Sequence, residues 1–312
     1  MKVINDLKDF TAGGFSSIAL GNFDGIHLGH QKLLKRLIES TERYSTKSVV
    51  FTFEPHPSQV LNGNDSPFLL TPLEDKIELI SKYGVEYLVL MPFTDSFSKM
   101  SPEGFVKEIL VDKMNVKYIV VGFNYKFGNM ASGSVDDLSR LSHMYNFKVE
   151  IVPPITHQKR VISSSYIREL LQIGDVKKVA ECLGRPYKIK GEVIHGDGRG
   201  KTIGIPTANL KLNHLIALPV NGVYIVEAIL KGERYMGVVN IGSKPTFNKW
   251  NPSIELHIVD YSGDIYNEII EVYFMDRIRS IKKFRDSTEL VNQIKQDIIV
   301  CRKFTGKDTG IV

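Results

Sequence analysis

The chain has 312 residues, more than most single hydrophobic cores accommodate, so two domains are expected. Hydrophobic residues make up 43% and charged residues 24% of the sequence, which excludes a disordered or fibrous chain. The formal net charge of +5 comes without a dense Lys/Arg block, so a phosphate-rich small ligand explains it as well as a nucleic acid would.

The two cysteines, Cys182 and Cys301, lie far apart and form no CxxC motif, so the sequence predicts neither a zinc site nor a redox site. A reducing cytoplasm is the expected compartment. The first ten residues are polar and include Asp6 and Asp9, unlike a signal peptide. No apolar run approaches the ~20 residues that a membrane span needs, so no membrane association is expected.

The first half of the chain alternates short apolar strands with amphipathic helices. Strands are expected at residues 17–20, 47–53, 87–90, 118–121 and 148–152. Helices are expected at 29–44, 71–83, from 101 onward, at 134–145, 164–172 and 175–183. This alternation predicts a parallel sheet covered by helices on both faces, with ligands at the carboxyl ends of the strands.

Capping residues mark where several of these helices begin. Thr71, followed by Pro72 and Glu74, predicts a capped helix start. Ser101 before Pro102 and Ser134 predict two further starts.

The pattern changes after Pro186 to short strand-like runs separated by turns. They are expected at residues 188–194, 222–230, 235–240, 254–259 and 269–274, and an amphipathic helix is expected at 287–302. This spacing predicts a small antiparallel barrel or sandwich followed by a C-terminal helix. We therefore expect domains at residues 1–184 and 185–312.

His27 and His30 stand three residues apart at the start of the first helix, which places both imidazoles near free backbone N–H groups. Gly21, Gly25 and Gly29 allow the backbone to approach a ligand closely. Two imidazoles and a helix N-terminus suit charge that develops on a phosphate during displacement. The pair alone could also be two surface histidines in a capped turn.

The surrounding segment, LGNFDGIHLGHQ at residues 20–31, resembles the HxGH nucleotidyltransferases. Within them it is similar to the adenylyltransferase half of bacterial bifunctional riboflavin kinase/FAD synthetases. Three later segments match that family in the same order: TFEPHP at 52–57, VGFNYKFG at 121–128 and SSSYIR at 163–168. The resemblance implies a Rossmann-like α/β domain that adenylylates FMN.

The resemblance also implies roles for single residues. It assigns the ATP phosphates to Gly21, Asn22, Phe23, Gly25, Gly29, Ser164, Ser165 and Arg168, with His27 and His30 as catalytic donors. It assigns the flavin to Asn124, Tyr125 and Phe127. Core packing for the aromatic residues, a rigid turn for His56 and a plain capped helix for 163–168 remain alternatives.

A glycine-rich segment at residues 191–209 offers a second phosphate site. Backbone N–H groups around Gly198, together with Arg199 and Lys201, could cradle a polyphosphate. The Thr207 hydroxyl and the Asn209 amide oxygen are hard ligands that suit Mg²⁺. A glycine-rich hairpin by itself could equally be a flexible turn.

This segment, GEVIHGDGRGKTIGIPTAN, resembles the riboflavin kinase signature, and residues 221–224, 237–247 and 254–257 match later parts of it. The resemblance makes Glu255 the catalytic glutamate and Arg279 a flavin-side residue, on a small antiparallel β-barrel. It implies ATP-dependent phosphorylation of riboflavin to FMN, followed by conversion of FMN to FAD with release of pyrophosphate. Met130 stands where a basic residue is frequent, which could remove one phosphate contact.

The expected enzyme is therefore a riboflavin kinase and FAD synthetase with Mg²⁺, with flavins as substrates and products, and with no nucleic-acid or membrane partner. Two alternatives stay open: a chain in which only the kinase half is fully active, and a regulator that binds flavin or nucleotide without turnover. The sequence leaves the oligomeric state open.

Overall fold

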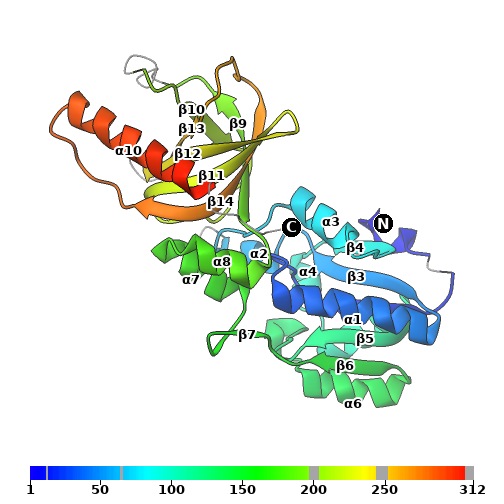
Figure 1. Cartoon of the computed structure of the whole chain (residues 1–312). Helices are drawn as coiled ribbons and strands as arrows, with labels where there is room; N and C mark the ends of the chain where they lie inside the picture. Colours follow the sequence, from blue (N-terminus) through cyan, green and yellow to red (C-terminus); the bar gives the residue numbers. More distant parts are fainter. Residues whose placement is uncertain (12, 64–65, 197–203, 244–251, 306–312) are drawn as a thin grey trace. The chain divides into compact units, whose positions relative to one another are not determined.

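The computed structural model describes residues 1–11, 13–63, 66–196, 204–243 and 252–305 and divides the chain into two compact units, Met1–Ser164 and Ser165–Val312 (Figure 1). This division falls at the first residue of a helix. The domain boundary near residue 185 stays a prediction.

A six-stranded parallel sheet forms the first unit, with the strand order β1-β4-β3-β2-β5-β6. The strands are β1 (Lys2–Ile4), β2 (Ser16–Leu20), β3 (Lys47–Phe53), β4 (Tyr87–Met91), β5 (Val116–Gly122) and β6 (Lys148–Val152). The parallel α/β fold and the five expected strands are confirmed. The sequence did not predict β1, because a strand of three residues is too short to show periodicity.

Helices connect these strands along both faces of the sheet (Figure 1). The α-helices are α1 (Leu28–Tyr44), α2 (Pro57–Asn62), α3 (Leu73–Ser81), α4 (Asp95–Ser98), α5 (Pro102–Gly104) and α6 (Val135–Tyr145). A π-helical segment, η3 (Phe105–Val111), continues α5, and short 3-10 turns lie at Leu7–Asp9 and Asn129–Ala131. A small hairpin, β7 (Thr156–His157) and β8 (Arg160–Val161), precedes the end of the unit.

The predicted start of α3 is wrong in one detail. Pro72 occupies the cap position without a side-chain hydrogen bond, and Thr71 does not cap the helix. The backbone N–H of Thr71 instead donates to Asp24 Oδ1 at 3.2 Å. The cap at Ser134 is confirmed, because its hydroxyl accepts from the Asp137 N–H in a capping box.

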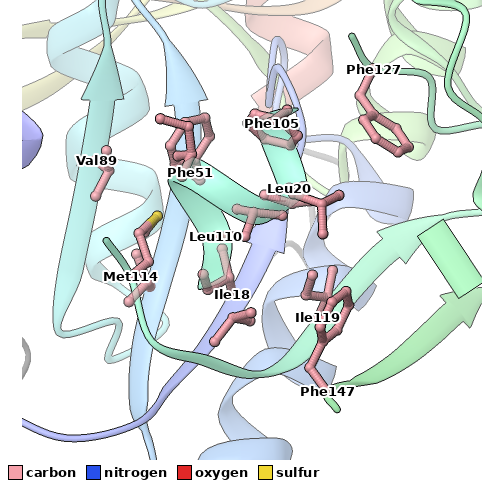
Figure 2. Close-up of a cluster of buried hydrophobic side chains, with 14 of the residues drawn as sticks. Ile18, Leu20, Phe51, Val89, Phe105, Leu110, Met114, Ile119, Phe127 and Phe147 are labelled. Carbon is pink, nitrogen blue, oxygen red and sulfur yellow. The ribbon is translucent and has the colours of Figure 1, made fainter. Parts of the chain in front are cut away.

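Side chains of the central strands alternate between two hydrophobic clusters, one on each face of the sheet. One cluster packs against η3 and α6 (Figure 2), and it includes Ile18, Leu20, Phe51, Val89, Phe105, Leu110, Ile119 and Leu138. The other packs against α1 and α3 and includes Ala19, Leu34, Leu37, Val50, Ile80, Leu88 and Val120. Burial on both faces fixes the carboxyl ends of the strands, where the candidate residues lie.

The second unit contains a closed barrel in the order β10-β13-β12-β11-β14-β9, in which all neighbouring strands are antiparallel. The strands are β9 (Tyr187–Ile194), β10 (Ala208–Leu212), β11 (Gly222–Leu230), β12 (Glu233–Ser243), β13 (Pro252–Ile258) and β14 (Ile269–Arg279). Helices α7 (Ser164–Ile173) and α8 (Val176–Leu183) precede it, and α10 (Ser287–Thr305) follows it. The predicted barrel and C-terminal helix are confirmed, whereas β10 was not predicted.

Strand registers separate the inside of the barrel from its outside. The inside holds buried residues that lie opposite one another on neighbouring strands, among them Tyr187, Ile189, Tyr224, Val226, Val239, Leu256, Val272 and Phe274. On the outside, Val223, Ile225, Val238 and Val259 form a separate cluster with Cys301 of α10. Helix α10 therefore covers one part of the outer surface of the barrel.

Within the described part of the chain, no helix combines the length and the apolar character needed to cross a membrane.

Candidate active sites

The first candidate site is the loop between β2 and α1. Phe23 (φ 50°), Gly25 (φ 87°) and Ile26 (φ 41°) all adopt the left-handed conformation. Residues other than glycine rarely adopt this conformation, and those that do concentrate at functional sites, where the surrounding structure holds them. The loop is therefore a constrained segment rather than a simple connection.

Two side chains hold the first part of this loop through one backbone carbonyl. The Asn22 carbonyl oxygen accepts a hydrogen bond from Thr52 Oγ1 at 3.1 Å and another from Lys76 Nζ at 3.2 Å. Thr52 and Lys76 are buried, and the Asn22 side chain is exposed. The sequence did not single out Lys76, because a lysine within an amphipathic helix normally faces solvent.

The Asp24 carboxylate ties the middle of the loop to the segment before α3. Its Oδ1 accepts hydrogen bonds from the backbone N–H groups of Leu70 at 2.9 Å and Thr71 at 3.2 Å. The Ser164 hydroxyl donates to the Asp24 carbonyl oxygen at 2.9 Å. The structure thus brings one predicted phosphate residue, Ser164, against the predicted phosphate loop.

The two histidines stack on each other at the start of α1. Their ring centroids are 3.8 Å apart and the ring planes differ by 17°. His27 is the N-cap residue of α1, and its Nδ1 accepts from the His30 backbone N–H at 3.4 Å. A Cβ atom at Gly29 would lie 3.0 Å from the His27 ring, so this position favours glycine for space rather than for backbone conformation.

Burial lowers the pKa of His30 well below its ordinary value, and the nearby His27 and Lys76 lower it further. Its Nδ1 atom is buried and has no hydrogen-bond partner among the described residues. A protonated ring would place an unpaired N–H and a positive charge there. His30 is therefore neutral near pH 7, with one nitrogen available as a donor.

The other predicted phosphate residues, Ser165 and Arg168, follow on α7 and belong to the second unit. Ser165 is exposed, and Arg168 is half-buried one turn further along the helix. Their phosphate roles stay predictions.

The predicted flavin residues of the first unit lie in the turn after β5. The rings of Tyr125 and Phe127 stack at 5.7 Å, with an angle of 15° between their planes. Phe127 is buried in the core and contacts Phe105, so for this residue the structure shows the packing role that the sequence left open. Asn124 is exposed in the same turn, and burial raises the pKa of the Tyr125 phenol.

A row of polar residues crosses the outside of the barrel and forms the second candidate site. Asn209 of β10 lies opposite Glu255 of β13, and Glu255 lies opposite Asn240 of β12. Residues directly opposite each other in antiparallel strands point to the same face. The Ser253 hydroxyl donates to Glu255 Oε1 at 3.2 Å. Asn240 is the residue that sequence reasoning did not single out, because cross-strand register is not visible in the sequence.

The row continues across β11 to β14, where Val223 lies opposite Asn240 and then Arg279 lies opposite Val223. With neighbouring strands ~4.8 Å apart, Arg279 lies roughly 14 Å from Glu255 along the row. The Arg279 guanidinium donates to both carboxylate oxygens of Asp297 on α10, at 2.8 to 3.1 Å. The structure therefore places the predicted metal residue Asn209 beside the predicted catalytic residue Glu255, whereas Arg279 lies beyond Val223 of the apolar cluster under α10.

Close packing surrounds Asn209. A Cβ atom at Gly196 would collide with the Asn209 side chain, so this glycine leaves room for the amide. The carbonyl oxygen of Pro206 lies 2.8 Å from His257 Nδ1, which fixes the chain beside Thr207. The predicted phosphate residues Gly198, Arg199 and Lys201 lie outside the described residues.

The donor set suits a hard cation bound together with a phosphate ligand. Thr207 and Asn209 offer neutral oxygens, and the Glu255 carboxylate lies beside Asn209. No group of three or more His, Cys, Asp or Glu residues that could hold a metal occurs in the described ranges. These residues fit Mg²⁺ held largely by phosphate oxygens and water, and not a cage made by the protein alone.

Comparison with known proteins assigns both units to enzyme families. Residues 13–166 match the FAD synthetase family, and residues 183–305 match the riboflavin kinase family. A bifunctional riboflavin kinase/FMN adenylyltransferase from Bacillus subtilis is 43% identical over 290 residues, 90% of each chain. The enzyme of the same description from Escherichia coli K12 is 33% identical and covers 93% of this chain and 92% of its own.

One solved structure is similar over nearly its whole length. It is described as a macrolide-efflux protein from Streptococcus pneumoniae, with 35% identity and a TM-score of 0.89, and the match covers 96% of this chain and 98% of that one. From these matches and the two sites, we conclude that the chain belongs to the bifunctional riboflavin kinase/FMN adenylyltransferase family.

Proposed function

We propose that this chain makes FMN from riboflavin in the barrel unit and FAD from FMN in the parallel-sheet unit. Membership of the family makes it an ATP-dependent transferase with both activities. The observation that carries the assignment of sites is that each unit has its own cluster of residues suited to phosphate chemistry. The stacked histidines lie in the first unit, and the row from Asn209 to Arg279 lies in the second.

In the barrel unit, Glu255 acts as the base. It takes the proton of the riboflavin 5′-hydroxyl while that oxygen bonds to the ATP γ-phosphorus and the bond to ADP breaks. The Ser253 hydroxyl, 3.2 Å from Glu255 Oε1, orients the carboxylate. Asn240 flanks Glu255 on the side opposite Asn209 and positions the hydroxyl or the phosphate.

Thr207 and Asn209 would hold Mg²⁺ together with the ATP phosphates. Bound there, the ion would neutralise charge on the phosphate oxygens during transfer. Arg279 lies at the far end of the same row, and its Nε and Nη2 groups donate hydrogen bonds to Asp297. We infer that it shapes the flavin side of the site mainly through the position of its strand end.

In the parallel-sheet unit, a phosphate oxygen of FMN attacks the α-phosphorus of ATP, and pyrophosphate leaves. The nucleophile is already an anion, so the step needs donors rather than a strong base. His27 and the neutral His30 supply such donors at the N-terminus of α1, beside the backbone of Gly21, Asn22, Phe23 and Gly25. Ser164 adds a phosphate contact and Asn124 with Tyr125 contacts the flavin, whereas the phosphate roles of Ser165 and Arg168 on α7 stay predictions.

The direct test is incubation of the full chain with riboflavin, ATP and Mg²⁺, with the flavins separated by chromatography. Formation of FMN and then FAD is the expected result. FMN alone would support a chain in which only the kinase half works. Binding of flavin without either product would support a regulator and contradict the proposal. Omission of Mg²⁺ is the control, and it should stop FMN formation.

Two free, buried cysteines fit a reducing compartment, and we propose the cytoplasm as the place of action.

A further inference from the structure

Lys76 is a buried charged residue for which the family's two reactions offer no evident role. Its side chain lies on α3 and the residue is 1% exposed, as deeply buried as the aliphatic core around it. Lysines are almost never fully buried unless they are paired, because removing an ammonium group from water is costly. A burial of this kind needs a compensating environment.

The environment of Lys76 consists of groups that face the phosphate loop. Its Nζ donates to the Asn22 carbonyl oxygen at 3.2 Å, and the described residues give the ammonium no other hydrogen bond. The carboxylates of Asp24 and Glu54 favour its charged form, whereas burial lowers its pKa. Asp24 also accepts hydrogen bonds from two backbone N–H groups, which hold its carboxylate beside the loop.

The positive charge of Lys76 also acts on the stacked histidines. His27 and His30 lie 3.8 Å apart between ring centroids, so two imidazolium rings would repel each other at close range. Protonation of His30 would also place an unpaired N–H at its buried Nδ1. Lys76 adds a third positive charge nearby, which lowers the pKa of His30 further. The negative charges of Asp24 in the loop and of Glu54 just after β3 stabilise the charged form of Lys76.

We propose that Lys76 is a positioning residue of the adenylyl-transfer site, whose buried ammonium fixes the Asn22 carbonyl and disfavours a positive charge on the stacked histidine pair. A neutral imidazole keeps one N–H donor for a phosphate and one nitrogen free of a proton. The inference rests on the proposed role of the Gly21–His30 loop in FAD formation.

The test compares Lys76→Met with Lys76→Arg and Thr52→Val in the full chain. NMR titration of labelled histidine rings measures the pKa of His30, assigned by the loss of its signal in His30→Ala. We expect Lys76→Met to raise this pKa, because the variant removes one of the positive charges that lower it. Lys76→Arg keeps the charge and should leave the pKa low. Thr52→Val removes only the other hydrogen bond to Asn22 and should also leave it low.

Activity gives the second readout. Lys76→Met and Thr52→Val should both slow conversion of FMN to FAD, while the kinase reaction of the same molecules continues at the rate of the unmodified chain. In Lys76→Met alone, the acid side of the pH profile for FAD formation should move to higher pH. Lys82→Met is the matched control, because Lys82 ends the same helix in an exposed pair with Glu78.

An unchanged His30 pKa in a folded Lys76→Met variant would overturn the inference. If that variant does not fold, a rise of the pKa to the ordinary histidine value in Lys76→Arg would overturn it equally. A raised pKa in Lys76→Met together with full FAD formation by His30→Ala would leave the electrostatic effect standing and refute the proposed catalytic role of His30. The electrostatic effect of Lys76 and the catalytic role of His30 can therefore be refuted independently.

Discussion

Among single residues, Asn240 offers the most specific test of the proposed kinase site. It lies directly opposite Glu255 on the outside of the barrel. We expect Asn240→Ala to lower the rate of FMN formation by roughly 100-fold, because loss of a positioning contact beside the base misplaces the reacting groups. FMN-to-FAD conversion should not change.

Chromatographic assays of both reactions in the same preparation check this prediction. Tyr235→Phe is the control, since Tyr235 stands near the other end of β12 beside Glu233. A kinase rate equal to that of the unmodified chain would remove Asn240 from the site.

A second prediction concerns how the state of His30 makes the stability of the fold depend on pH. Burial, His27 and Lys76 together lower the pKa of His30 well below its ordinary value of 6.5. Below pH 6.5 the unfolded chain binds a proton at this residue that the folded chain does not, so stability falls as the pH drops. The loss is complete once the pH reaches the lowered pKa of the folded state.

Hydrogen exchange in α1 between pH 7.5 and pH 5.5 measures this effect on the full chain. His30→Gln should reduce the dependence of α1 stability on pH in this range. His143→Gln, at an exposed position of α6, should leave it unchanged. Equal pH slopes for His30→Gln and the unmodified chain would contradict the buried, neutral state of His30.

Residues of the sites differ in how far the sequence could reveal them. His27, His30 and Glu255 stand in recognisable motifs, so their proximity to loops and strand ends could be predicted. Lys76 and Asn240 could not, because their neighbours are distant in the chain and are brought together only by packing and strand register. Phe127 stands in a predicted ligand motif and is also buried in the core, so its flavin role stays a prediction.

Among the elements, α10 makes a testable contribution to the barrel. Asp297 is 2% exposed and accepts hydrogen bonds from Nε and Nη2 of Arg279 of β14 and one from Gln293. Asp297→Asn leaves the guanidinium without its counter-charge. We expect a loss of about 2 kcal/mol in the stability of the second unit, below the usual range for a buried pair because the Arg279 side chain is 20% exposed.

Hydrogen exchange of β11 and β14 in the full chain measures this loss. Asp260→Asn is the matched control, because Asp260 and Arg302 form an exposed pair that contributes little. Equal losses in the two variants would show that α10 is held by its apolar contacts alone.

The starts of the helices differ in how well the sequence could predict them. Ser134 and Asp175 cap their helices through local hydrogen bonds, and such bonds depend on residues three positions apart. Thr71 was mispredicted because a distant partner, the Asp24 carboxylate, binds its N–H. Strand β10 alternates apolar and polar residues from Ala208 to Leu212, but it ends the glycine-rich segment that was interpreted as a phosphate loop, and its pairing with β9 and β13 is not visible in the sequence.

For the whole molecule, the fold class followed from periodicity because alternating strands and helices have few solutions. The open parallel sheet and the closed antiparallel barrel each bury hydrophobic residues of their own. The closure of the barrel depended on the family resemblance, because spacing alone leaves a barrel and a sandwich open, and the order of its strands was not predicted.

The proposed function requires two independent sites in the chain, one for each reaction. The most direct measurement follows riboflavin, FMN and FAD over time with two variants, Glu255→Gln and His30→Ala, alone and mixed. We expect Glu255→Gln to convert FMN to FAD but to make no FMN, His30→Ala to make FMN but little FAD, and the mixture to make FAD from riboflavin. Loss of both reactions in either folded variant would contradict it.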